Sequence, residues 1–233
     1  MGKKLGIVMD PIGAINPKKD IALAMLLAAQ RRGWELHYFT QENLLIDNGI
    51  ARGYSQRLTV KDSLSEWFEL ESPSLLELAD LDVILMRKDP PFDSQFLHTT
   101  FVLEFASKKG TLVVNKPQSL RDCNEKVFAT EFPQCCPPVL ISANAARLRE
   151  FYQEHQDIIL KPLDGMGGAS IFRVKPDDPN LSVIIETLTG HQTQSVMAQR
   201  YIPEIVEGDK RILLIDGKPV PLALARIPAA GET

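Results

Sequence analysis

In the first half of the chain, short apolar segments alternate with helical patterns. Residues 5–9 predict a buried strand, because the run is continuously apolar and ends at Asp10-Pro11. Asp20 is a typical N-cap for a helix over residues 21–32, and residues 35–39 then have β character. Strand, helix and strand at this spacing predict a βαβ unit with a right-handed crossover in a parallel sheet.

A second unit of the same kind follows. Residues 82–86 predict another buried strand, residues 95–109 a helix and residues 111–114 the next strand. Residues 43–72 are less regular, and they predict a hairpin over residues 49–60 and a short helix near Trp67. Together these elements predict an open α/β domain with a parallel, Rossmann-like sheet over residues 1–123.

The pattern changes near residue 124, and the second half of the chain is α+β in character. Helices are predicted over residues 125–131, 144–155 and 181–188, with Ser142 as a candidate cap of the second one. Strands are predicted over residues 158–162, 171–174, 196–201, 211–216 and 220–226. The sequence therefore predicts a second domain over residues 124–233.

Composition narrows the classes of function. The 233 residues are 44% hydrophobic and 24% charged, which is typical of a soluble globular protein, and a net charge of −4 argues against nucleic acid as a partner. Cys123, Cys135 and Cys136 form neither a disulfide framework nor a zinc motif, which suits a reducing cytosol. The apolar stretch at residues 21–29 is shorter than the roughly 20 residues of a membrane helix. We therefore expect a cytoplasmic protein without membrane contact.

Lys161 and the glycines after it form the most informative candidate site. A lysine at a strand end can place its ammonium group on phosphate oxygens, and Gly165, Gly167 and Gly168 let backbone N–H groups approach them. The spacing matches neither the Walker motif nor the Rossmann fingerprint. An ordinary tight turn between two strands explains the same glycines, because glycine serves such turns everywhere.

Five further charged residues are candidates. Arg87 and Asp89 follow a predicted parallel strand, at the edge where open α/β sheets bind ligands, although a surface ion pair in a turn explains them equally. Lys126 at a predicted helix start is mildly unfavourable, which hints at a ligand, but a solvated lysine is the simpler interpretation. Arg211 and Arg226 lie in apolar strands, so each should have an anionic partner, either a ligand or a structural carboxylate.

Six longer segments resemble prokaryotic glutathione synthetases. They are spread over essentially the whole chain: residues 5–12, 80–93 (including Arg87-Lys88-Asp89-Pro90-Pro91-Phe92-Asp93), 114–126, 158–174 (including Gly165-Met166-Gly167-Gly168-Ala169-Ser170), 208–211 and 225–228. The resemblance implies a pre-ATP-grasp α/β domain followed by an ATP-grasp domain, whose two α+β lobes hold ATP between them. The first lobe would cover residues 124–199, and the second would begin at residue 200.

The resemblance also implies roles for individual residues. The implied nucleotide site contains the phosphate-binding lysines, the phosphate-covering loop and an interlobe hinge at the adenine: Lys126, Lys161, Gly165, Met166, Gly167, Gly168, Ser170, Gln199, Arg200, Tyr201 and Ile202. The implied peptide-substrate side contains Arg87, Asp89, Pro90 and Phe92. Arg211 and Arg226 would be catalytic and would face the phosphates and the reacting carboxylate.

The implied reaction is the ATP-dependent ligation of γ-glutamylcysteine with glycine through an acylphosphate, giving glutathione, ADP and phosphate. Such a transfer depends on positioning and on neutralising negative charge, which explains the lysines, the arginines and Mg²⁺. The resemblance places the Mg²⁺ ligands beyond Thr233, so we expect no metal ligand in this chain, an incomplete second lobe and a shortfall in catalysis. It also implies a homo-oligomer, a tetramer. Another ATP-grasp carboxylate–amine ligase and a non-catalytic nucleotide-binding fragment remain as alternatives.

Overall fold

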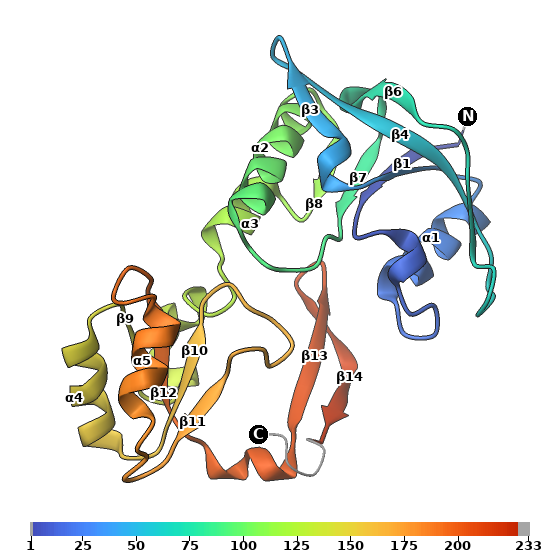
Figure 1. The fold of residues 1–233 in the computed structure, drawn as a ribbon. Coiled ribbons are helices and arrows are strands. Elements are labelled where there is room, and N and C mark those ends of the chain that lie inside the picture. The colour runs from blue at the N-terminus through green and yellow to red at the C-terminus, as the bar shows by residue number, and fades with distance from the viewer. Residues whose placement is uncertain (1, 228–233) are drawn as a thin grey trace. The chain divides into compact units, whose positions relative to one another are not determined.

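The chain folds as two compact units. The computed structural model describes residues 2–227. The first unit ends at Asn124 and the second begins at Glu125 (Figure 1). Within residues 2–227, no helix is both long and apolar enough to cross a membrane.

A mixed eight-stranded sheet forms the core of the first unit. Its main path runs β3-β4-β2-β1-β7-β8, and β5 and β6 pair with β4 beside this path. Neighbours among β2, β1, β7 and β8 are parallel, whereas β4 runs antiparallel to β2. The strands are β1 (Lys4–Val8), β2 (Glu35–Phe39), β3 (Leu44–Asp47), β4 (Ile50–Val60), β5 (Phe68–Leu70), β6 (Ser74–Glu77), β7 (Val83–Met86) and β8 (Leu112–Val114). The predicted α/β fold is confirmed, and the predicted parallel pairing holds for β2, β1, β7 and β8.

Two helices cover opposite faces of this sheet: α1 (Ile21–Arg31) and α2 (Ser94–Lys108) (Figure 1). Alternation along β1 explains these layers. Leu5 and Ile7 belong to one apolar cluster with Leu26 of α1, whereas Val8 belongs to another with Leu103 of α2. A third, short helix, α3 (Pro117–Asp122), follows β8.

The long helices begin where side-chain carboxylates cap them. Asp20 accepts a hydrogen bond from the Leu23 amide at 2.7 Å, as the sequence predicted, and Asp93 accepts one from the Phe96 amide at 2.8 Å. Gly6 has a packing role in β1, because a Cβ there would lie 2.7 Å from Leu81 Cδ1. Parallel pairing places the carboxyl ends of β1 and β7 side by side, with Val8 opposite Met86.

Two predictions for residues 43–72 are wrong. Residues 50–60 form one long strand, and the hairpin lies one strand earlier, where Asn48 and Gly49 turn β3 into β4. The segment at Trp67 forms no helix, because pairing with β4 draws it into an extended conformation: the Lys61 amide donates to the Trp67 carbonyl at 2.8 Å, and β5 follows. The Trp67 indole donates to the Ile12 carbonyl at 3.1 Å.

An antiparallel four-stranded sheet and two helices form the second unit up to Arg200. The sheet order is β11-β10-β12-β9, and α4 and α5 lie side by side on one face (Figure 1). Leu148, Ile158, Leu160 and Ile185 are fully buried between them. The elements are β9 (Val139–Ser142), α4 (Ala145–His155), β10 (Ile158–Pro162), β11 (Phe172–Val174), α5 (Leu181–Thr189) and β12 (Val196–Arg200).

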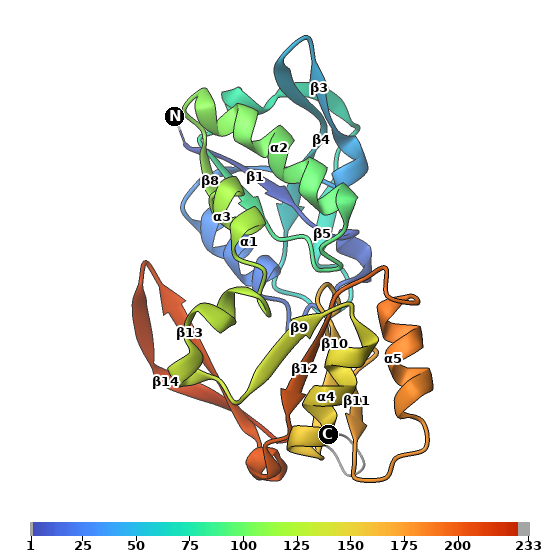
Figure 2. The same cartoon turned by 90° about the vertical axis from the view of Figure 1, so that its left-hand side faces the viewer.

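A two-stranded ribbon follows, made of β13 (Asp209–Ile215) and β14 (Lys218–Arg226) (Figure 2). Asp216 and Gly217 make the predicted turn, both with positive φ. Apart from Val220, which is half-buried, the apolar side chains of this ribbon are exposed among the described residues, and Leu222 is 80% exposed.

Three details of the second unit differ from the prediction. Residues 125–131 hold a turn and a 3-10 helix (Phe128–Glu131) instead of an α-helix. The α4 helix is capped by Asn144, whose side chain accepts from the Ala146 and Arg147 amides, because Ser142 belongs to β9 and accepts instead from the Asn144 amide. The strand β9 was not predicted, since Pro137 and Pro138 before it are typical of a loop.

Candidate functional site

Alternation along β10 turns Lys161 away from the helices. Ile158 and Leu160 face α4 and α5, so the side chain of Lys161 lies on the other face of the sheet. There its ammonium group donates to Gln199 Oε1 on the neighbouring strand β12, at 2.8 Å. The predicted strand therefore places Lys161 beside the first residue of the predicted hinge.

Lys126 lies in a turn, and its side chain extends toward Lys161 and the glycine loop. Its Nζ donates to the Gly165 carbonyl at 2.8 Å and pairs with Glu125 Oε1 at 2.7 Å. The side chain is 13% exposed. The helix-start argument for Lys126 is wrong, because no helix begins there, but the solvated-lysine interpretation also fails. Burial and the contact with the glycine loop distinguish this lysine.

These residues line one pocket of about 340 Å³. Gly167 and Gly168 have φ of +64° and +80°, a conformation that glycine adopts without strain. The pocket is lined by Glu125, Lys126, Lys161, Pro162, Gly165, Met166, Gly167, Gly168, Ala169 and Ile171. The structure thus brings together six of the residues predicted for the nucleotide: both lysines, the three glycines and Met166.

A second, smaller pocket of about 110 Å³ shares Glu125, Lys126 and Lys161 with the first. Its other lining residues are more apolar: Ala129, Thr130, Cys136, Pro137, Val139, Met197 and Gln199. A charged pocket at a glycine loop, next to a less polar one, matches the two chemical parts of a nucleotide.

The charges at this site are coupled. Burial lowers the pKa of Lys161, and the nearby charge of Lys126 lowers it further, while Glu125 and Cys136 act in the opposite direction. Two ammonium groups that line one pocket with the glycine loop favour an anion between them. The arrangement can therefore bind phosphate oxygens.

The other predicted nucleotide residues do not line these two pockets, Gln199 excepted. Ser170 follows the glycines with a positive φ of 57°. Tyr201 is buried under the guanidinium of Arg173, which lies 3.4 Å from the ring centroid, and Arg173 also pairs with Asp157. Arg200 and Ile202 on either side are exposed.

Arg211 and Arg226 lie on the β13–β14 ribbon, and there the structure contradicts the expected burial. Both are exposed among the described residues, because β13 and β14 pair only with each other. Arg226 pairs with Asp209, with 2.7 Å between Nε and Oδ1, and this pairing raises the pKa of Arg226. A structural carboxylate thus satisfies Arg226, which was one of the two alternatives.

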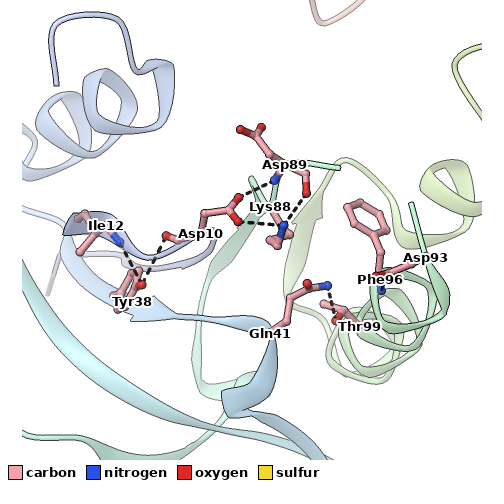
Figure 3. Close-up of polar contacts among 9 residues, drawn as sticks. All are labelled: Asp10, Ile12, Tyr38, Gln41, Lys88, Asp89, Asp93, Phe96 and Thr99. Carbon is pink, nitrogen blue, oxygen red and sulfur yellow. Dashed lines mark hydrogen bonds and ion pairs between the residues drawn. The ribbon is translucent and has the colours of Figure 1, made fainter. Parts of the chain in front are cut away.

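In the first unit, the loop after β7 is fastened to the end of β1 (Figure 3). Asp10 accepts from the Asp89 amide at 2.9 Å and from Lys88 Nζ at 2.9 Å. The peptide bond between Pro90 and Pro91 is cis, and the Phe92 ring packs on Phe96 with 5.1 Å between the centroids.

Arg87 differs from its neighbours in this loop. It is exposed, and its guanidinium makes no hydrogen bond or ion pair among residues 2–227. The four residues predicted for the peptide substrate therefore lie on one loop, with Arg87 as its free cation.

Asp10 and Glu125 are two functional candidates that the sequence did not single out. Asp10 ends β1 beside the end of β7, so the rule that parallel strands end at one edge was the signal for it. Glu125 precedes Lys126 in one of the segments that resemble the family, but only its contact with the lysine shows that it lines the site. For metals, residues 2–227 contain no group of three His, Cys, Asp or Glu side chains that could hold an ion.

Solved structures of other proteins share this fold. The structure of D-cycloserine synthetase DcsG matches 97% of this chain and 72% of its own, with a TM-score of 0.62 at 13% identity. The D-alanyl-alanine synthetase A of Vibrio cholerae matches 94% of this chain and 66% of its own, with a TM-score of 0.55 at 11% identity. Both likenesses show the fold, and the match of residues 125–233 to an ATP-grasp family model places the chain in the ATP-grasp class.

Family models and curated relatives narrow this class. Residues 4–121 match the prokaryotic glutathione synthetase N-terminal domain, and residues 125–233 match the ATP-grasp domain of the same family. The glutathione synthetase of Pseudomonas aeruginosa is 64% identical over 233 residues, which are 100% of this chain and 74% of the relative. That of Escherichia coli K12 is 61% identical over 230 residues, 99% of this chain and 73% of the relative. The chain belongs to the prokaryotic glutathione synthetase family, as the resemblance implied.

Proposed function

We propose that this chain binds ATP and acts in the ligation of γ-glutamylcysteine with glycine. A carboxylate oxygen of γ-glutamylcysteine attacks the γ-phosphorus of ATP, with ADP as the leaving group. The glycine nitrogen then attacks the acyl carbon, and phosphate leaves. The observation that carries the proposal is the convergence of Lys126 and Lys161 on the Gly165–Gly168 loop.

The residues of the two pockets fit the nucleotide. Lys126 and Lys161 hold phosphate oxygens, and Lys126 exchanges its contact with the Gly165 carbonyl for one with phosphate. The loop of Gly165, Met166, Gly167, Gly168 and Ser170 covers the phosphates. The backbone at Gln199, Arg200, Tyr201 and Ile202 meets the adenine, beside the smaller pocket that Gln199 lines.

Arginines bind the carboxylate of γ-glutamylcysteine and neutralise the negative charge that develops during the reaction. The free guanidinium of Arg87 binds a carboxylate of γ-glutamylcysteine, on the loop with Asp89, Pro90 and Phe92. Arg211 and Arg226 neutralise charge at the reacting carboxylate from the second lobe. The Asp209 carboxylate orients Arg226 for this role.

Mg²⁺ is not fitted by the described residues. Residues 2–227 offer no set of three acidic, histidine or cysteine ligands, so no step is assigned to the metal. The proposal also includes a cytoplasmic location and a tetramer of identical chains. The cytoplasmic location is supported by Cys123, Cys135 and Cys136, which are all free thiols. The tetramer is supported by the family resemblance.

The test is release of ADP from MgATP by the purified chain, with γ-glutamylcysteine and glycine added separately and together, and with glutathione measured by mass spectrometry. In line with the expected shortfall in catalysis, we expect slow turnover, with ADP and glutathione formed only when both substrates are present. Calorimetry with MgATP alone measures the nucleotide site directly. Lys161→Met should abolish both signals, and Lys175→Met, the same change at an exposed position of the second unit, should leave them unchanged.

Other outcomes exclude the proposal. Retention of MgATP without any turnover would indicate a nucleotide-binding module, and ADP release with other acid and amine pairs would indicate a different ATP-grasp ligase. Equal losses in the Lys161→Met and Lys175→Met variants would show that the pocket is not the nucleotide site.

A further inference from the structure

The loop of residues 87–93 carries two neighbouring cations, Arg87 and Lys88, and the structure gives them different surroundings. Arg87 is exposed and has no side-chain partner among residues 2–227. Lys88 is folded back, with 19% of its side chain exposed, and its Nζ lies 2.9 Å from Asp10 Oδ1 and 2.6 Å from the Asp89 carbonyl.

Asp10 joins two segments that are far apart in the sequence. One carboxylate oxygen accepts from Lys88 Nζ and the other accepts from the Asp89 amide, so the carboxylate closes a ring with the loop backbone (Figure 3). The Arg87 amide donates to the Val8 carbonyl at 2.7 Å, shortly before Asp10 on the β1 side. Both flanks of Arg87 are thus attached to the end of β1.

Asp10 itself is held from the other side. The Tyr38 hydroxyl donates to the Asp10 carbonyl at 3.4 Å and accepts from the Ile12 amide at 3.2 Å. Tyr38 is 4% exposed, and burial raises its pKa, so the hydroxyl keeps its proton. Tyr38 of β2 therefore holds the turn after β1, which contains Asp10, independently of the loop after β7.

We propose that Asp10 is a positioning residue that holds the loop after β7, with Lys88 as its counter-charge, so that Arg87 alone is presented to a substrate carboxylate. This inference rests on the proposed function for the role of Arg87. The two adjacent cations then have different roles: Lys88 stabilises the loop, and Arg87 binds the carboxylate of γ-glutamylcysteine. An exposed flexible arginine would have to be ordered on binding, whereas a loop fixed at both flanks lowers that entropic penalty.

The chain contains a matched control at the opposite edge of the same two strands. Asp82, immediately before β7, accepts from the Lys4 amide of β1 at 2.7 Å and pairs with Lys3. Its side chain is 42% exposed, against 35% for Asp10. Asp10→Ala and Asp82→Ala therefore remove equivalent bridges, one at the carboxyl ends of the strands and one at the amino ends.

The experiment compares the wild-type chain with Asp10→Ala, Asp10→Asn and Asp82→Ala. In Asp10→Ala we expect KM for γ-glutamylcysteine to rise roughly 3- to 10-fold, with kcat and KM for ATP within about twofold of wild type. KM of Asp10→Asn for γ-glutamylcysteine should lie between those of wild type and Asp10→Ala. The amide oxygen still accepts from the Asp89 N–H, but the neutral side chain no longer pairs with Lys88. Asp82→Ala should leave all these constants unchanged.

Hydrogen exchange gives a readout that needs no substrate. The amides of residues 87–89, 92 and 93 should exchange faster in Asp10→Ala than in wild type, and at the wild-type rate in Asp82→Ala. Unchanged exchange in Asp10→Ala, or an equal rise of KM in Asp82→Ala, would overturn the positioning role. Absence of γ-glutamylcysteine-dependent turnover in the wild-type chain would instead count against the proposed function, and the exchange data would still decide the role of Asp10.

Discussion

Gly168 offers a direct test of the proposal that residues 165–170 cover the phosphates of ATP. Its φ is +80°, and no heavy atom lies within 4 Å of a Cβ built on it, so Gly168→Ala changes backbone preference without a clash. The left-handed conformation costs an L-residue about 1–2 kcal/mol, a factor of about 5 to 30 in an equilibrium constant.

Because the loop is exposed, the strain should affect nucleotide binding more than the stability of the free protein. Residues 166–170 are exposed, so in the free protein the alanine variant can relax away from the left-handed conformation. Binding of the phosphates then has to restore that conformation. We therefore expect Kd for MgATP to rise about 5- to 30-fold by calorimetry, with Tm within about a degree of wild type.

Gly49 is the matched control. Its φ is +79°, a Cβ built on it would also meet no heavy atom within 4 Å, and it lies in the β3–β4 turn of the first unit. Gly49→Ala should leave Kd unchanged and lower Tm, because the hairpin cannot relax without loss of strand pairing. The reasoning is refuted if Gly168→Ala binds MgATP as tightly as wild type, or if Gly49→Ala weakens binding equally.

Three further predictions concern the two cores and the smaller pocket. Leu160 is fully buried in β10, so Leu160→Ala should lower the free energy of unfolding of the second unit by about 2–5 kcal/mol in urea titrations. Burial lowers the pKa of His37, so the folded state binds a proton less readily than the unfolded state. Stability should fall as the pH drops below about 6.5, and His37→Gln should flatten this dependence. Cys136 lines the smaller pocket, so MgATP should slow its alkylation in the Cys135→Ser variant but not that of Cys123.

Each of these predictions has a result that contradicts it. A loss below about 1 kcal/mol for Leu160→Ala would mean that the core tolerates the cavity. Parallel stability curves of the wild type and His37→Gln between about pH 5 and 7.5 would remove His37 as the titrating group. Equal protection of Cys123 and Cys136 by MgATP would place the nucleotide elsewhere or indicate a general conformational change.

The sequence predicted most elements because their signals are local. The Asp20 cap and the helix after it, the strand at residues 158–162 and the turn at Asp216-Gly217 depend on neighbours within a few residues. Lys161 and its glycines were found for the same reason, since they are close together in the chain. The segment at Trp67 was missed because its conformation depends on a strand partner, β4.

The site required contacts between distant residues, and only the tertiary structure supplied them. The sequence did not show that Lys126 donates to the Gly165 carbonyl. Nor did it show that Asp10 pairs with Lys88, while the Arg87 side chain has no partner among residues 2–227. It also misplaced Arg226 in a buried strand. By itself the sequence determined the elements, the glycine loop and the family, because these depend on local order. The pairing of each charge depended on which strand ends the sheets bring side by side, and that is a property of the folded chain alone.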